Sequence, residues 1–142
     1  MPTRNAQARW EGSLQQGNGK ISVASGALEA PYSFSSRFQD GPGTNPEELI
    51  GAAHAGCFSM AFSLILAQAG HAPESIETRA AVTIEKQAEG FAITRIDLTT
   101  EAKVPGIDEK TFQEKAQAAK KGCPVSKALS DSIEIRLTAR RV

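Results

Sequence analysis

Residues 49–69 read LIGAAHAGCFSMAFSLILAQA, and this stretch decides the fold of the chain. Its 21 residues include no Asp, Glu, Lys or Arg, so they predict a helix that is apolar on all sides. The length also meets the criterion for a membrane span. However, His54, Gln68, two glycines and two serines interrupt the run, and alanines outnumber the large aliphatic residues. We therefore expect a long helix buried within protein.

The residues on either side of this stretch mark the ends of the helix. The start signals are a capping Thr44 or Asn45, Pro46 in the first turn, and the acidic pair Glu47 and Glu48 beside the positive end of the helix dipole. Gly70 and Pro73 predict that the helix ends near Ala69.

The rest of the chain predicts short strands before this helix and longer strands mixed with helices after it. Before the long helix we expect strands within 5–14, 20–25 and 26–34, with a hairpin turn at 15–20 and a loop at 35–49. After it we expect strands at 75–86 and 91–104, joined near Glu89 and Gly90, then helices at 108–121 and 123–129, and a last strand at 132–141. This order predicts an α+β fold with mixed and antiparallel sheets around the long helix, in a single domain over residues 1–142.

Composition narrows the class of protein. The chain has 142 residues, 40% of them hydrophobic and 23% charged, which is typical of a soluble globular domain. Sixteen basic residues balance sixteen acidic ones, so nucleic acid is not an expected partner. Residues 1–12 contain no apolar signal region, which favours a cytoplasmic location where thiols stay reduced.

The two cysteines, Cys57 and Cys123, lie 66 positions apart, so no paired zinc-ligand spacing exists. Burial in the apolar helix raises the pKa of Cys57 and leaves the thiol inert unless a cation lies near it. Cys123 precedes Pro124 and is expected to cap a new helix, where backbone N–H groups favour a thiolate. Local physics therefore favours Cys123 as the more acidic thiol. Simple packing of both side chains is the alternative.

Three stretches together resemble the OsmC/Ohr family of osmotically inducible and organic hydroperoxide resistance proteins. They are ARWEGSLQQGNGKISVASGAL at 8–28, YSFSSRFQDGPGTNPEELIGAAHAGCFSMAFS at 32–63 and KGCPVSKAL at 121–129. They cover most of the chain in the family's order and include both cysteines. The W-x-G-x-L opening and the SRF before GTNPEEL look more like the OsmC branch.

The resemblance implies a cofactor-free, thiol-dependent peroxidase for organic hydroperoxides, with hydrogen peroxide as a second candidate substrate. It implies that Cys57 attacks the peroxide and becomes a sulfenic acid, and that Cys123 resolves it as a disulfide. An external dithiol, lipoyl-type in the Ohr branch, resets the enzyme. Arg37 then lowers the pKa of Cys57 and binds peroxide oxygens, while Glu47 orients Arg37, with Glu48 as the alternative carboxylate. Phe58 and Met60 are candidates for lining the substrate pocket.

The spacing of Glu47 and Cys57 bears on the assembly. Ten residues of continuous helix give about 15 Å of rise, too far for one shared site. Either the helix breaks between them, or Glu47 serves the site of a second subunit. We expect the second, because the resemblance implies an intertwined homodimer with sites at the interface.

Three other functions remain open. His54 lies one turn before Cys57, so a Cys–His hydrolase or transferase is one. A zinc site that uses His54, Cys57, Cys123 and His71 is another. The third is a non-catalytic protein that binds small apolar molecules, which predicts no peroxide consumption.

Overall fold

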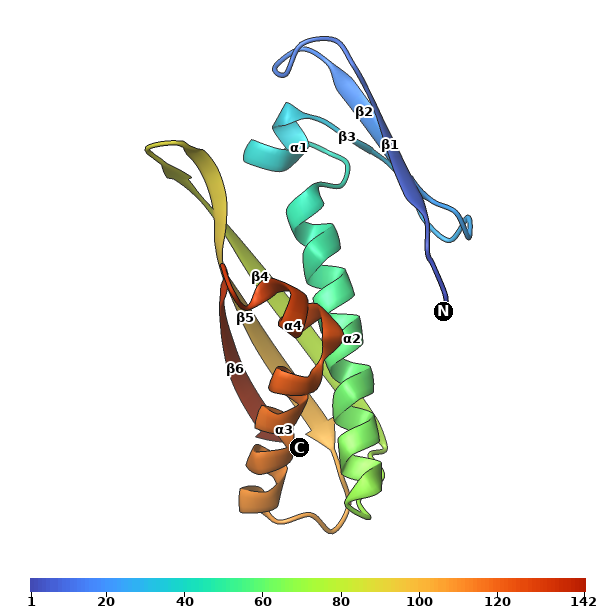
Figure 1. The fold of residues 1–142 in the computed structure, drawn as a ribbon, viewed down its shortest axis with the longest axis vertical. Helices are drawn as coiled ribbons and strands as arrows, with labels where there is room; N and C mark the ends of the chain where they lie inside the picture. The colour runs from blue at the N-terminus through green and yellow to red at the C-terminus, as the bar shows by residue number, and fades with distance from the viewer. The chain divides into compact units, whose positions relative to one another are not determined.

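A computed structural model describes all of residues 1–142. In it the chain forms two compact units, residues 1–49 and residues 50–142. The first unit contains a three-stranded antiparallel sheet, in the order β1 (Ala6–Glu11), β2 (Asn18–Val23) and β3 (Glu29–Tyr32), followed by the short helix α1 (Phe34–Phe38) (Figure 1). The prediction of three short strands before the long helix is confirmed.

The first hairpin turn lies three residues earlier than the sequence predicts. Asn18 and Gly19 already belong to β2, where they pair with Glu11 and Trp10. Gly19 is required there because the rings of Trp10 and Tyr32 approach with centroids 5.3 Å apart, and a Cβ on Gly19 would lie 2.4 Å from the Tyr32 ring. The predicted turn position of Gly19 is therefore wrong, and the glycine leaves room for this aromatic pair.

Helix α1 replaces part of the predicted loop at 35–49. Ser33 caps it: the Ser33 hydroxyl accepts from the Ser36 N–H at 3.1 Å, and the Ser36 hydroxyl accepts from the Ser33 N–H at 2.8 Å. The Ser36 hydroxyl also donates to the carbonyl of Thr44 at 2.7 Å, which fastens the following loop to α1. Such a single turn has no apolar periodicity, so the hydrophobic pattern did not indicate it.

Helix α2 (Pro46–Gln68) is the predicted long helix, and it is continuous. Of the two candidate caps, Asn45 provides the hydrogen bond, since its Oδ1 accepts from the Glu48 N–H at 2.8 Å. Gly70 follows the helix with a φ of 85°, in the left-handed region that favours glycine. The predicted ends are therefore confirmed to within one residue.

The second unit contains a mixed sheet of β4 (Ser75–Gln87), β5 (Gly90–Lys103) and β6 (Glu134–Arg141), with β5 in the centre. Strands β4 and β5 form an antiparallel hairpin that turns at the predicted position. Strands β5 and β6 are parallel, so the chain between them crosses back over the sheet through α3 (Glu109–Gly122) and α4 (Pro124–Leu129). The predicted α+β class with mixed and antiparallel sheets is confirmed.

The core of this unit lies between one face of α2 and the sheet. Phe58, Phe62 and Leu66 are fully buried on α2, and the Phe62 ring meets the ring of Phe112 on α3 edge-on at 5.5 Å. Ser59 adds a polar contact by donating to Thr78 of β4 at 2.8 Å. One face of the helix thus supplies the apolar layer that the sheet and α3 cover.

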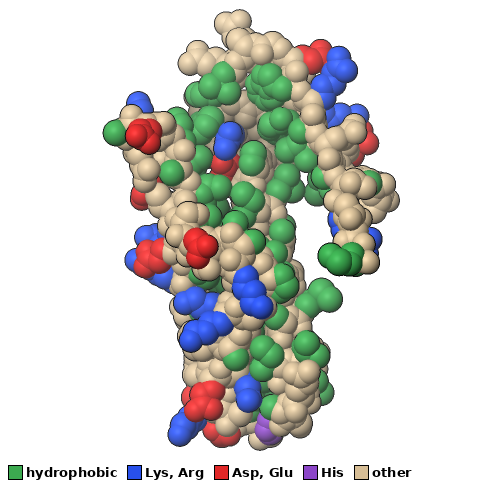
Figure 2. Space-filling view, viewed as in Figure 1, with side chains coloured by type: hydrophobic (Ala, Val, Ile, Leu, Met, Phe, Trp, Pro, Cys, Tyr) green, Lys and Arg blue, Asp and Glu red, His purple; other side chains and the backbone are tan.

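The opposite face of α2 is not buried within the chain. Met60 is 77% exposed and Leu64 is 58% exposed, and Figure 2 shows hydrophobic side chains on the surface over α2. The expectation of a buried helix therefore holds for one face only. By length and composition α2 could cross a membrane, but its fully buried phenylalanines are those of a core helix.

Candidate active site

The second unit brings the two cysteines together. Cys57 lies in the middle of α2 and is half-buried, whereas Cys123 caps α4 and is fully buried. Both thiols are free, and they lie close enough together for Cys123 to raise the pKa of Cys57. Residues 66 positions apart thus form one pair, because the crossover from β5 to β6 carries α4 onto α2.

The surroundings of Cys57 change the pKa of its thiol in opposite directions. Burial raises the pKa of the Cys57 thiol, and the neighbouring Cys123 raises it further. The backbone N–H of Val125, in the first turn of α4, donates to the Cys57 sulfur and lowers the pKa in part. As predicted, Cys123 caps α4 with Pro124 next to it, but its side chain accepts no capping hydrogen bond. The sequence predicts that backbone N–H groups in the first turn of α4 favour a thiolate at Cys123. In the structure the N–H of Val125 in this turn instead lowers the pKa of Cys57.

A second polar pair lies one helical turn from the thiols. His54 Nε2 and the Ser126 hydroxyl are 2.7 Å apart, with His54 fully buried and Ser126 3% exposed. His54 Nδ1 is buried without a hydrogen-bond partner. Burial lowers the pKa of His54, so the ring is neutral near pH 7. Ser126 and Val125 were not predicted from the sequence as site residues. A signal was present for Ser126, because it follows Cys123 by three residues just as Cys57 follows His54 by three.

This contact bears on two of the alternative functions. The one hydrogen bond of the His54 ring goes to Ser126, and no hydrogen bond joins His54 to Cys57 as a Cys–His pair requires. No group of three His, Cys, Asp or Glu side chains lies close enough together to hold a metal ion, so the four proposed zinc ligands do not converge. Neither arrangement has the geometry that its chemistry needs.

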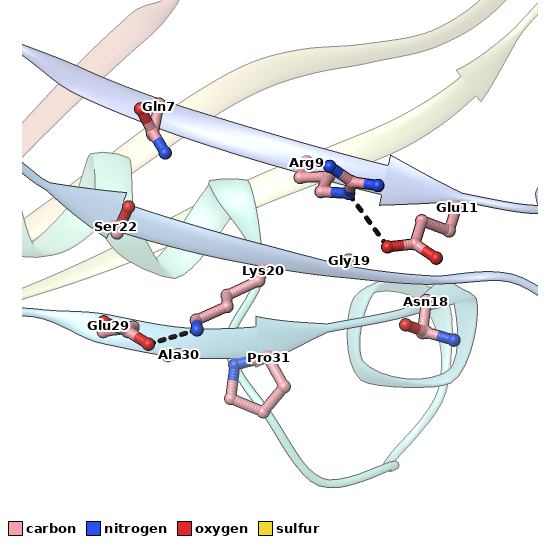
Figure 3. A pocket seen from close by; sticks show the side chains of 10 residues that line it. All are labelled: Gln7, Arg9, Glu11, Asn18, Gly19, Lys20, Ser22, Glu29, Ala30 and Pro31. Atoms are coloured by element: carbon pink, nitrogen blue, oxygen red, sulfur yellow. Dashed lines mark hydrogen bonds and ion pairs between the residues drawn. The ribbon is translucent and has the colours of Figure 1, made fainter.

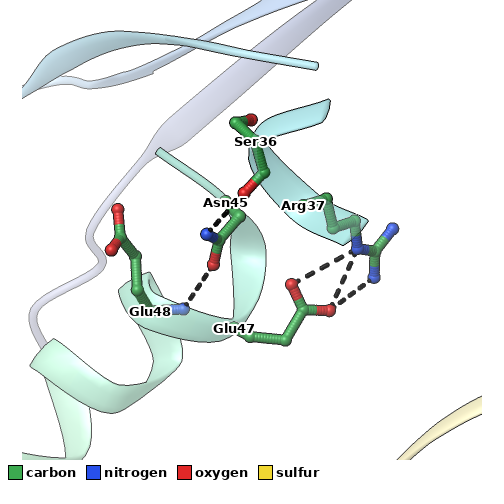
Figure 4. A network of polar contacts seen from close by, with 5 residues as sticks. All are labelled: Ser36, Arg37, Asn45, Glu47 and Glu48. Atoms are coloured by element: carbon green, nitrogen blue, oxygen red, sulfur yellow. Dashed lines mark hydrogen bonds and ion pairs between the residues drawn. The ribbon is translucent and has the colours of Figure 1, made fainter. Parts of the chain in front are cut away.

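The first unit contains the predicted arginine and its carboxylate. Arg37 of α1 and Glu47 of α2 form a two-point ion pair, with Nη2 to Oε1 at 2.8 Å and Nε to Oε1 at 3.0 Å (Figure 4). The Glu47 side chain is 9% exposed and that of Arg37 36% exposed. The Arg37 guanidinium also lies 5.2 Å from the centre of the Phe38 ring. This geometry holds a permanent cation in one orientation.

Glu48 has a different set of contacts from Glu47. It accepts from the Thr44 hydroxyl at 2.7 Å, and its N–H is capped by Asn45. Asn45 Nδ2 donates in turn to the Ser36 carbonyl at 3.0 Å, which ties α1 to the start of α2. Of the two neighbouring carboxylates, Glu47 is therefore the one that holds Arg37, and Glu48 belongs to the helix start (Figure 4).

The two candidate pocket residues are not brought together. Phe58 is fully buried and packs on Phe62 with ring centroids 5.6 Å apart, whereas Met60 points to the surface. They lie on different faces of α2. Met60 is one helical turn after Cys57, so it is the apolar side chain of the two on the open side of the helix.

A pocket in the first unit contains none of the predicted site residues. It is an open hollow of about 680 Å³ on one face of the β1–β2–β3 sheet (Figure 3). Arg9 pairs with Glu11, and Lys20 pairs with Glu29, so its charged side chains neutralise one another. No cysteine or histidine lines this pocket, and the Lys20 amine is held in an ion pair with Glu29.

Comparison with known proteins places these features in a family. The sequence model of the OsmC-like protein family matches residues 39–138, which include Glu47, Cys57 and Cys123 and begin two residues after Arg37. The peroxiredoxin OsmC of Escherichia coli is 53% identical over 133 residues, which cover 93% of each chain.

More distant relatives belong to the hydroperoxide resistance branch. An organic hydroperoxide resistance protein-like protein of Staphylococcus saprophyticus is 31% identical over 121 residues, covering 84% of this chain and 85% of its own. The crystal structure of an organic hydroperoxide resistance protein from Elizabethkingia anophelis superposes with a TM-score of 0.80 at 26% identity, covering 100% of this chain and 98% of that one. The higher identity to the OsmC protein favours that branch, as predicted. The chain belongs to the OsmC family.

Proposed function

We propose that this protein is a cysteine-based peroxidase that reduces organic hydroperoxides, with Cys57 as the attacking thiol and Cys123 as the resolving thiol. The peroxiredoxin relative at 53% identity supports the activity, and the hydroperoxide resistance relatives support the substrate class. The observation that carries the proposal is the proximity of the two thiols where α2 meets α4, with Cys57 packed against the core that contains Cys123.

In the first step the Cys57 thiolate attacks the peroxide. The sulfur bonds to one peroxide oxygen, the O–O bond breaks, and the leaving alkoxide takes a proton, giving Cys57 sulfenic acid and an alcohol. The Val125 N–H on the Cys57 sulfur favours the thiolate in a setting where burial opposes it. Met60, one turn along on the open side of α2, provides apolar contact for the organic group.

In the second step the Cys123 sulfur attacks the Cys57 sulfenic acid, a disulfide forms, and water leaves. An external dithiol then exchanges with this disulfide, returning both thiols and becoming a disulfide itself. We expect a lipoyl-type dithiol for this step. These reactions use only the two protein sulfurs, the peroxide and the dithiol, so no cofactor takes part.

Arg37 supplies the positive charge in this proposal. A guanidinium beside the reacting sulfur stabilises both the thiolate and the developing charge on the peroxide oxygens. Because α2 is continuous, the ten residues between Glu47 and Cys57 span about 15 Å of rise. We therefore assign the Arg37–Glu47 pair of one chain to the Cys57 site of a second copy.

This assignment requires a homodimer, and the exposed apolar side chains of α2 support one. Leu64→Glu places a charge on this face, and we expect it to shift the molecular mass measured by size-exclusion chromatography with light scattering from dimer to monomer. Leu14→Glu makes the same change at an exposed leucine between β1 and β2 and serves as the control. A wild-type protein with the mass of one chain would contradict the assignment.

The central experiment is mass spectrometry of the reduced protein after one equivalent of cumene hydroperoxide. We expect a loss of two mass units and a peptide cross-link between Cys57 and Cys123, with both reversed by dihydrolipoamide. Hydrogen peroxide, given in parallel, ranks the two substrates. A reduced protein that leaves both peroxides unconsumed would refute the proposal and favour a binding protein instead.

Two substitutions separate the roles of the thiols. Cys57→Ser should lower peroxide consumption by at least about a thousandfold, because it removes the nucleophile. Cys123→Ser should consume one equivalent and then stop or over-oxidise at Cys57, because nothing resolves the sulfenic acid. If Cys123→Ser turns over normally with a dithiol, Cys123 has no resolving role.

The cytoplasmic location and the single domain are also part of this proposal. A reducing compartment suits an enzyme whose resting state is two free thiols. The family match over residues 39–138 crosses the boundary between the two compact units, which supports one domain over residues 1–142.

A further inference from the structure

His54 is a buried polar side chain that the peroxidase chemistry does not use. It is fully buried on α2, yet its ring makes one hydrogen bond, from Nε2 to the hydroxyl of Ser126 on α4. Because water is excluded there, the ring depends on Ser126 for its polar contact. Removal of the hydroxyl would leave both ring nitrogens buried without partners.

The positions of this pair and of the thiols are matched. His54 precedes Cys57 by three residues on α2, and Ser126 follows Cys123 by three residues at the start of α4. Each spacing is about one helical turn. The two helices are therefore joined at two points, by the thiol pair and, one turn away, by the imidazole and the hydroxyl.

We propose that the His54–Ser126 hydrogen bond is a positioning device that sets the orientation of α4 and thereby aims the Cys123 sulfur at Cys57 for disulfide formation. This inference rests on the proposed roles of the two thiols. The bond is directional, so it fixes the rotation of the six-residue helix α4 about its axis, which apolar packing of Val125 and Leu129 leaves less defined.

Disulfide formation is the step most sensitive to that rotation. A disulfide forms only within narrow limits on the separation and direction of the two Cβ atoms. Peroxide attack needs the Cys57 sulfur, which α2 positions, but it does not need the Cys123 sulfur. Burial keeps the His54 ring neutral, so its effect on the thiols is geometric rather than a contribution of charge.

The test measures how the Cys57 sulfenic acid divides between two fates. The reduced protein receives one equivalent of cumene hydroperoxide in the presence of dimedone, and mass spectrometry gives the ratio of Cys57–Cys123 disulfide to dimedone adduct. This ratio is set after the sulfenic acid has formed, so it does not depend on the rate of peroxide attack. A change in folded fraction alone does not move it.

Ser126→Ala should lower the ratio of disulfide to adduct about tenfold. Ser126→Thr, which keeps a hydroxyl at this position, should restore it to within about threefold of wild type. His54→Gln, which keeps an amide nitrogen near the place of Nε2, is the second conservative variant and covers the case in which the extra methyl of threonine is not accommodated. Ser130→Ala removes an exposed hydroxyl at the end of α4 and is the matched control.

The outcomes separate this inference from the proposed function. A wild-type protein that forms no Cys57–Cys123 disulfide overturns both. A wild type that forms the disulfide, together with a Ser126→Ala variant whose ratio is unchanged, overturns the positioning role alone. Equal losses in Ser126→Ala and in both conservative variants also overturn it, because they would show that packing volume rather than the hydrogen bond matters.

Discussion

The surroundings of Cys57 and those of Arg37 differ in how their polar groups are held. Around Cys57 the polar groups form no ion pair: burial raises the pKa of the Cys57 thiol and keeps the His54 ring neutral, and a 2.7 Å hydrogen bond joins His54 to the Ser126 hydroxyl. Around Arg37, a guanidinium and a carboxylate are charged and form an ion pair, with the arginine 36% exposed. The proposed attacking sulfur lies in the first region, and the proposed cation lies in the second. The proposed peroxidase chemistry uses both groups, so it predicts that changes in either region lower peroxide reduction.

Among changes that leave both thiols in place, the largest expected effect comes from removing the cation. Arg37→Ala should lower the catalytic rate on the order of a hundredfold, because the thiolate and the peroxide oxygens lose their charged partner. The pH midpoint of Cys57 alkylation by iodoacetamide should move upward at the same time. Arg9→Ala, which removes an exposed arginine on β1, is the control. An unchanged alkylation profile in Arg37→Ala would show that the two regions work independently.

A smaller effect is expected when the cation stays but loses its carboxylate. Glu47→Gln should lower the rate about tenfold, because Arg37 is no longer held in one orientation. Steady-state kinetics with cumene hydroperoxide measures this loss. Glu48→Gln makes the same change next to it, at a carboxylate that does not contact Arg37. Equal losses in the two variants would indicate a general effect on the start of α2 instead.

The smallest effect concerns the stability of the region around Cys57. Burial lowers the pKa of His54, so above the unfolded value of about 6.5 the ring is neutral in both states and contributes no pH dependence. Below that value His54 binds a proton in the unfolded chain but stays unprotonated in the folded chain. Stability should therefore fall as the pH drops from about 6.5 to the lowered pKa, by at most about 1.4 kcal/mol per pH unit.

Urea unfolding at pH 7.5, 6.5 and 5.5 measures this slope. His54→Gln should flatten it, whereas His71→Gln removes the other histidine and should leave it in place. A slope that survives in His54→Gln would show that other groups cause the pH dependence.

Local signals in the sequence predicted most of the elements. Asn45, Pro46 and Gly70 marked the ends of α2, and Gly90 marked the turn of the β4–β5 hairpin, because capping and turn chemistry act within a few residues. The same local reasoning gave a wrong position for Gly19, which lies in a strand rather than in the turn. Gly19 leaves room for an aromatic contact between neighbouring strands, and a local sequence pattern does not reveal such a contact.

Long-range contacts were harder to predict. The family resemblance indicated Cys57, Cys123, Arg37 and Glu47, but Val125 and Ser126 were missed because their contacts join residues 68 and 72 positions apart. His54 was considered as a base for Cys57, since a neighbour on the same helix was the only partner visible in the sequence. Its hydrogen bond to Ser126 arises from the crossover that brings α4 onto α2.

The parallel pairing of β5 with β6 also affects how the protein is made. Cys57 and Cys123 are both synthesised before Glu134, but α4 lies in the connection that β6 closes when it joins the sheet. We therefore expect a nascent chain that lacks β6 to contain both sulfurs without the closed connection that holds α4 against α2. On this view the two cysteines come together late, after the final strand has paired with β5.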